Sequence, residues 1–293
     1  MLNSICSRSI AVWNWIQLNG TVSKHIEAAY NTSLKRTRYV GASRRLRSPL
    51  SSALEMAVLE EIITIEEICI PRTPTQFLEW FEDKLREIKE TGGINVQVIL
   101  REGIGKFFYE EVFPLFRLLQ NKKDAWGELK FKNVYGDQPF DVEIFGSKES
   151  EFPSFLEITM ADQNYEDHLR MRYFTEHGDV CMTGPVTHTG TRKTGLNVSV
   201  ANEAGDLTEM NQEKKDLIRN AIARKTSKAY PENTGLLVYF DDYVAFSMYK
   251  DKAVMDRFLD ELDVDWTDKF SALYLVGASG NQIWERYRSE QDA

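Results

Sequence analysis

The stretch PFDVEIFGSKESEFPSFLEITMA, residues 139–161, decides the fold. It contains two apolar, β-rich runs at 140–145 and 154–160, joined by a polar turn. Each run has an acid among large apolar residues, Asp141 in the first and Glu157 in the second. A carboxylate in such a strand is costly to desolvate unless it is paired, hydrogen-bonded or bound to a cation. We therefore predict a β-hairpin whose two acids lie on one face, within metal-binding distance of each other.

The composition indicates an ordinary globular protein. The chain has 293 residues, 42% hydrophobic and 28% charged, which is enough for one large domain or two modest ones. No apolar run approaches the ~20 residues that cross a bilayer, and the first residues lack a signal-peptide pattern. Three cysteines, odd in number and far apart, form no disulfide framework. We expect a cytoplasmic protein without a membrane partner.

Charge is distributed unevenly along the chain. Residues 1–52 contain eight Lys or Arg and one acid, whereas the rest contains 28 basic and 44 acidic residues. Such a basic arm indicates contact with a polyanion such as DNA, or with an acidic protein surface; a solvated basic face is the alternative. Arg44, Arg45 and Arg47 are the predicted nucleic-acid contacts. A helix-turn-helix in the arm and a helical arm that packs on a partner subunit both remain open.

The rest of the chain alternates between helical and strand patterns. A helix is expected from Ser48-Pro49 to just before Pro71, and a second from Thr73-Pro74 to Gly92-Gly93. The further expected elements are a strand at 94–100, a helix at 105–120 with a kink at Pro114, strands at 126–134, 140–145 and 154–160, a helix at 165–176, an inserted β-hairpin within 179–200, a helix at 208–228, a strand at 236–240, a helix at 251–262, and strands at 271–277 and 282–286. We predict a helical N-terminal region with its basic arm at 1–92 and an α/β domain at 93–293.

The order helix, strand, strand with Asp, strand with Glu, helix, strand resembles the core of the PD-(D/E)XK, or restriction-endonuclease-like, nuclease superfamily. The resemblance covers residues 103–240, roughly half of the chain. It implies an α/β (α+β) fold with a mixed sheet flanked by helices. It also implies that Asp141 and Glu157 hold Mg²⁺, assisted by Glu110 or Glu111 in the preceding helix. Hard carboxylate oxygens suit Mg²⁺, which keeps several waters and takes one or two protein carboxylates.

The sequence departs from the family pattern at one position. Family members have a Lys two residues after the Glu, which helps to position or deprotonate the attacking water. Here that position is Thr159, which is neutral. Lys225 and Lys228 on the later helix are the candidates for the missing cation.

Two other groups of residues are weaker candidate sites. Arg192 and Lys193 lie in the predicted hairpin tip GTRKTG, which lacks the ending of a phosphate-binding loop. That tip is either a contact for a phosphate backbone or an exposed turn. Four residues of zinc-ligand type have spacings that fit no standard zinc module: His168, His177, Cys181 and His188.

The sequence therefore favours a metal-dependent nuclease that hydrolyses phosphodiester bonds in DNA. Two alternatives remain open. One is a catalytically inactive nuclease-fold module that binds nucleic acid or protein. The other is an assembly protein whose basic arm docks on the acidic body of a neighbour in a homo-oligomer. In both alternatives Asp141 and Glu157 face solvent or pair with Arg and Lys instead of holding a metal.

Overall fold

The computed structural model describes eight segments of the chain. They are residues 59–90, 96–146, 152–163, 165–181, 184–191, 194–203, 206–242 and 252–288. The predicted arm with Arg44, Arg45 and Arg47, and the hairpin-tip residues Arg192 and Lys193, lie outside the described residues.

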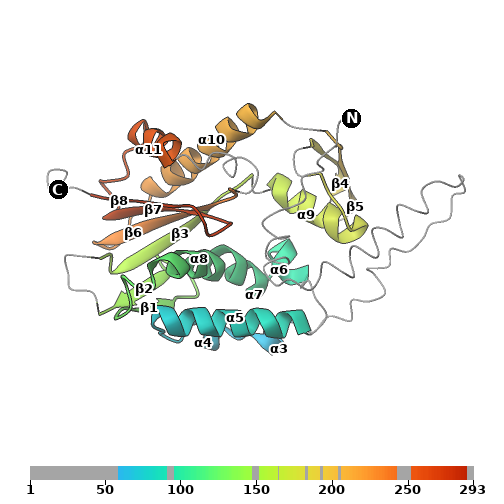
Figure 1. Ribbon diagram of the computed structural model, residues 1–293. Helices are drawn as coiled ribbons and strands as arrows, with labels where there is room; N and C mark the ends of the chain where they lie inside the picture. Colours follow the sequence, from blue (N-terminus) through green and yellow to red (C-terminus); the bar gives the residue numbers. More distant parts are fainter. Residues whose placement is uncertain are drawn as a thin grey trace, which may run out of the picture.

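A mixed six-stranded sheet, ordered β1-β2-β3-β6-β7-β8, forms the centre of the molecule (Figure 1). Strands β3, β6 and β7 run parallel, while the β1-β2, β2-β3 and β7-β8 pairs are antiparallel. The separate hairpin β4-β5 is also antiparallel. The strands are β1 (Lys130–Asn133), β2 (Val142–Phe145), β3 (Phe155–Ala161), β4 (Val186–Thr191), β5 (Gly195–Val200), β6 (Thr234–Phe240), β7 (Ala272–Gly277) and β8 (Ile283–Tyr287). The predictions of a mixed α+β fold and of an inserted hairpin are confirmed.

Helices cover both faces of this sheet. In Figure 1, α5 and α8 lie on one side of the strands and α10 and α11 on the other, with α9 and the β4-β5 hairpin beyond one end of the sheet. The helices are α3 (Leu59–Ile62), α4 (Ile65–Ile68), α5 (Pro74–Glu90), α6 (Val96–Leu100), α7 (Ile104–Phe107), the π-helix η1 (Phe108–Val112), α8 (Phe113–Lys122), α9 (Tyr165–His177), α10 (Leu207–Thr226) and α11 (Lys252–Asp260). No helix in the described segments has the length and apolar character needed to cross a membrane.

Two hydrophobic cores, one on each face of the sheet, hold the layers together. Strand β6 is buried along its whole length, as expected for a central strand covered on both sides. Its side chains alternate between the two faces. Leu237 and Tyr239 join the core beneath α5 and α8, whereas Leu236 and Val238 join the core beneath α10 and α11.

The start of α5 follows from its local sequence. The backbone N–H of Thr73 donates to Gln76 Oε1 (3.0 Å), and the N–H of Gln76 donates to Thr73 Oγ1 (3.4 Å), which is a reciprocal capping box. Pro74 occupies the first helical position, where its missing N–H has no cost. The buried face of the helix packs on α8, with the rings of Phe81 and Phe116 4.1 Å apart. The predicted helix start is confirmed.

The prediction of a strand at 94–100 is wrong, because residues 96–100 form the helix α6. The sequence is rich in β-formers, but β-propensity measures the fit to a pleated, half-buried surface more than a backbone preference. Val98 and Ile99 are adjacent and both buried, which a strand with one solvated face does not allow. Gln97 anchors the helix, since its Oε1 accepts a hydrogen bond from the backbone N–H of Leu59 (2.9 Å).

The predicted helix at 105–120 is confirmed as three contiguous helical segments that together span residues 104–122. A π-turn, η1, separates α7 from α8 and lies directly before the predicted kink at Pro114. Proline has no N–H to donate to the preceding turn, and the wider π-turn accommodates this break in the helical ladder. The helix expected before Pro71 is also divided within the described residues, because Thr64 caps α4 by accepting from the N–H of Glu67 (3.1 Å).

Candidate active site

Asp141, directly before β2, lies close to Glu157 of the neighbouring strand β3. In the β2-β3 pair Val142 faces Leu156, the residue before Glu157. The N–H of Asp141 donates to the carbonyl of the same Leu156 (2.8 Å), so the pairing is bulged at this point. The Asp141 carboxylate is close enough to Glu157 for the charge of Glu157 to raise the pKa of Asp141. The two carboxylates that the sequence singled out are therefore brought together.

The Asp141 carboxylate is held tightly in this position. Its Oδ2 accepts a hydrogen bond of 2.6 Å from the backbone N–H of Ile158. Burial and the nearby negative charge of Glu157 raise the pKa of Asp141 to about 7, although the hydrogen bond from Ile158 and the charge of Lys225 act in the opposite direction. Two acids that share a poorly solvated site need a compensating positive charge.

Lys225, on helix α10, supplies a positive charge next to the two acids. Its ammonium group contacts Glu157 Oε1, and both side chains are largely buried, with 15% and 8% of their surfaces exposed. The helix places it there because Ala221 and Ile222, about one turn earlier, are buried in the core beneath α10. A position 68 residues away in sequence thus places an amino group beside Glu157.

Thr159, two residues after Glu157, is on the same face of β3. Its Oγ1 accepts a hydrogen bond from Arg224 (2.9 Å), which also donates to the carbonyl of Met160 (3.3 Å). Arg224 was not among the residues predicted from sequence, and its position next to Lys225 on α10 was the available signal. Lys228 lies farther along the chain, and its positive charge partly offsets the rise in the pKa of Asp141.

Glu111 approaches the acid pair from the π-turn. Burial is the main cause that raises its pKa to about 9, and the charges of Asp141, Glu110 and Glu157 add to it. The π-turn carries Glu111 on a widened backbone segment, a feature often found at functional sites. Of the two helix acids considered, Glu110 instead lies 3.7 Å from Arg101, so Glu111 is the one electrostatically coupled to the carboxylate pair.

The residues present fit a hard divalent ion. Asp141 and Glu157 offer two carboxylates, the number that Mg²⁺ commonly takes from a protein while it keeps its waters. Within the described segments, no three residues of His, Cys, Asp or Glu are arranged to hold a metal ion, so Glu111 does not complete a closed protein cage. The same finding applies to the zinc-type residues, of which His177 stacks on Tyr173 with ring centroids 4.0 Å apart.

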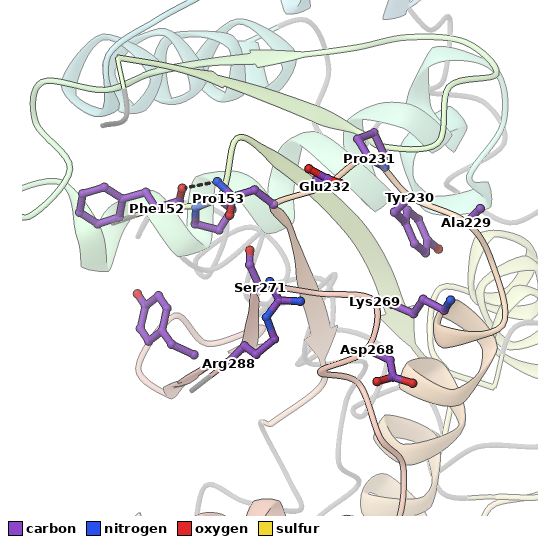
Figure 2. Close-up of a pocket in the computed structure, with 12 residues that line it drawn as sticks. Phe152, Pro153, Ala229, Tyr230, Pro231, Glu232, Asp268, Lys269, Ser271 and Arg288 are labelled. Atoms are coloured by element: carbon purple, nitrogen blue, oxygen red, sulfur yellow. Dashed lines mark hydrogen bonds between the residues drawn. The ribbon is translucent and has the colours of Figure 1, made fainter. Parts of the chain in front are cut away.

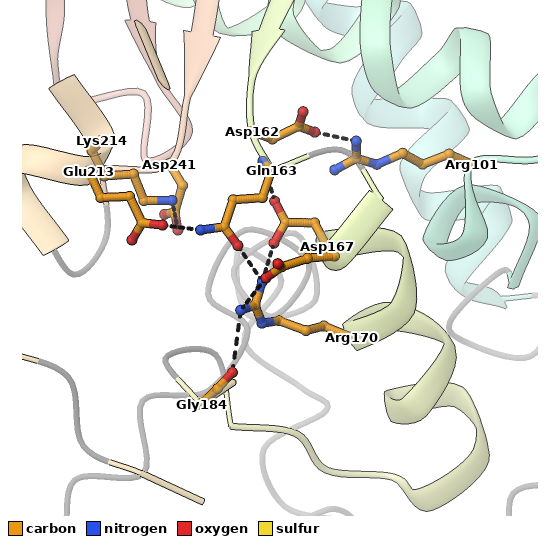
Figure 3. Close-up of polar contacts among 10 residues, drawn as sticks. Arg101, Asp162, Gln163, Asp167, Arg170, Gly184, Glu213, Lys214 and Asp241 are labelled. Carbon is orange, nitrogen blue, oxygen red and sulfur yellow. Dashed lines mark hydrogen bonds and ion pairs between the residues drawn. The ribbon is translucent and has the colours of Figure 1, made fainter. Parts of the chain in front are cut away.

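A second polar cluster lies at the carboxyl ends of β3 and β6, the edge where many α/β sheets bind ligands (Figure 3). Arg170 donates to Gln163 Oε1 (2.7 Å) and to the carbonyl of Gly184 (3.3 Å). Lys214 of α10 lies 3.6 Å from Asp241, which follows β6. These groups already bind one another, so the cluster joins α9, the hairpin and α10 to the sheet.

Comparison with known proteins gives no further guide. No protein-family model matches the chain, and neither does a curated protein or a solved structure.

Proposed function

We propose that the protein is a metal-dependent nuclease that hydrolyses phosphodiester bonds in DNA. The observation that supports this most is the proximity of Asp141 to Glu157, with Lys225 of α10 in contact with Glu157. Buried carboxylates are rare without compensation, and groups with strongly perturbed pKa values gather at functional sites. One bound ion explains why Asp141, Glu157 and Lys225 lie together.

The strand order supports a restriction-endonuclease-like core. Helix α8 precedes the antiparallel strands β1, β2 and β3, and α10 then crosses over so that β6 pairs in parallel with β3. The same sequence of elements underlies the resemblance stated for residues 103–240. In this arrangement the two acids come from β3 and from the residue directly before β2, and the amino group comes from the crossover helix.

Each residue of the site has a separate role in this proposal. Asp141 and Glu157 hold Mg²⁺, which supplies an activated water and stabilises charge on the phosphate. Lys225 has three N–H donors and gives one to Glu157, so the others are free to orient a water or a phosphate oxygen. Glu111 is able to hold a proton near neutral pH because of its raised pKa. Thr159 does not replace the lysine, since Arg224 already holds its hydroxyl group.

The test is cleavage of DNA by purified protein with Mg²⁺ or Mn²⁺. Asp141→Asn and Glu157→Gln are expected to abolish cleavage without loss of folding. Glu143→Gln is the matched control, because this acid is only two residues from Asp141 but pairs with Lys132 at 3.2 Å. Cleavage that survives in Asp141→Asn contradicts the proposal.

A catalytically inactive nuclease-fold module is the second candidate. The observation that favours it is Thr159 in the position of the lysine, together with the use of Lys225 as a partner of Glu157. For a metal-binding enzyme, free Mg²⁺ at a hundred times its Kd raises the free energy of unfolding by about 2.7 kcal/mol. Absence of both cleavage and this stabilisation favours the inactive module.

A further inference from the structure

A polar pocket of about 660 Å³ opens at one end of the sheet (Figure 2). It is built from the segments that precede β3, β6 and β7 and from the end of β8. Its volume is within the usual range for sites that bind small organic groups. Because four adjacent strands contribute to it, its walls are fixed by the sheet itself.

One residue of the pocket wall, Tyr230, also lies next to the candidate active site. The Tyr230 hydroxyl faces the Glu157 carboxylate without the geometry of a regular hydrogen bond, and burial together with the charges of Glu157 and Asp141 raises its pKa. Tyr230 therefore connects the pocket to the two carboxylates.

Cationic and aromatic groups line the pocket together. Lys269 and Arg288 are exposed, and Arg288 donates to the carbonyl of Thr267 (3.3 Å). Within the described residues no carboxylate forms an ion pair with either of them. Tyr287 is 48% exposed at the same pocket, and Tyr230 provides a second ring. Figure 2 shows Tyr230 on one wall, and Arg288 beside Ser271 on another. Two acids, Glu232 and Asp268, also line it, so a purely anionic ligand is less well matched than one with an uncharged, stackable part.

A nucleotide of a single-stranded nucleic acid has both an anionic phosphate and an uncharged base that is able to stack. Proteins hold unpaired nucleic acid by stacking bases on aromatic side chains while cations follow the backbone. A concave pocket admits one splayed base, whereas a base in a duplex stays in its stack. We propose that this pocket binds an unpaired nucleotide next to the scissile phosphate, with Tyr287 against the base and Lys269 and Arg288 at its phosphates. This inference rests on the proposed nuclease function and narrows its substrate to DNA with a single-stranded segment.

The test is binding, measured without cleavage. Fluorescence anisotropy in EDTA compares a labelled single-stranded oligonucleotide with a blunt duplex of the same sequence. Tyr287→Ala is expected to weaken single-strand binding about fivefold to a hundredfold, the range for loss of one base–aromatic stack. Lys269→Ala combined with Arg288→Ala is expected to lower the slope of log K against log salt by about 1.4, for two phosphate contacts on a single strand. Duplex binding is expected to stay unchanged in both variants.

Two control variants match these substitutions elsewhere on the surface. Tyr165→Ala removes a tyrosine that is 55% exposed on α9, and Lys130→Ala removes an exposed lysine on β1. Melting curves of every variant verify folding. Unchanged single-strand affinity in the pocket variants, or equal losses in the control variants, overturns the inference.

The outcome for the pocket is separate from the outcome for catalysis. Cleavage that depends on Asp141, together with normal binding by the pocket variants, refutes the pocket and leaves the nuclease function standing. Single-strand binding that depends on Tyr287, Lys269 and Arg288 without any cleavage supports the pocket and refutes the nuclease function.

Discussion

The Asp141→Asn variant is expected to be more stable than the wild-type protein, by an amount that grows with pH. Burial and the charge of Glu157 raise the pKa of Asp141 from its ordinary value of 3.8 to about 7. The folded protein therefore binds a proton more tightly than the unfolded chain does. The contribution of this group to stability is complete below pH 3.8 and is lost as the pH rises toward 7.

The size of the effect follows from the same two values. Each tenfold change in proton affinity corresponds to about 1.4 kcal/mol, so the interval from 3.8 to about 7 corresponds to about 4 kcal/mol at most. Asparagine has nearly the same shape, and its Oδ1 is still able to accept the hydrogen bond from Ile158. The asparagine side chain does not titrate, so the variant does not lose this stability as the pH rises, whereas the wild-type protein does.

Urea denaturation in EDTA at pH 4, 6 and 8 measures this difference. The free energy of unfolding of the variant is expected to be near that of the wild type at pH 4 and about 2–4 kcal/mol higher at pH 8. Glu143→Gln removes a carboxylate only two residues from Asp141, outside the acid pair, and serves as the control. A difference between Asp141→Asn and the wild type that stays constant across this pH range refutes the reasoning.

Two further predictions concern packing around the site and the sheet. Lys225→Met leaves the carboxylate of Glu157 buried without its cation and is expected to cost about 3–5 kcal/mol in urea denaturation. Most of this loss is expected to return in the double variant with Glu157→Gln; additive losses would argue against a direct pair. Gly277→Ala places a Cβ 2.4 Å from Asp242 Oδ2, which accepts a hydrogen bond from the Ser279 hydroxyl (2.5 Å), and is expected to cost about 1–3 kcal/mol. Its melting temperature should fall less in an Asp242→Ala background, and an equal fall in both backgrounds would rule out the clash.

Local patterns predicted much of the secondary structure. The capping residues at Thr73-Pro74 and the buried run at 236–240 correspond to α5 and β6. Such patterns succeed because helix and strand periods are properties of neighbouring residues. The prediction failed at 94–100, where an apolar β-rich segment became α6, because its neighbours in space decided its conformation.

The candidate site was likewise predictable from the sequence only in part. The sequence by itself determined that Asp141 and Glu157 are acids placed within apolar strand patterns, where an uncompensated charge is costly. Only the tertiary structure decided that α10 crosses the sheet so that Lys225 meets Glu157. It also placed Tyr230 between this pair and the pocket. Contacts between residues far apart in the chain depend on how whole layers pack, and no local period in the sequence encodes that arrangement.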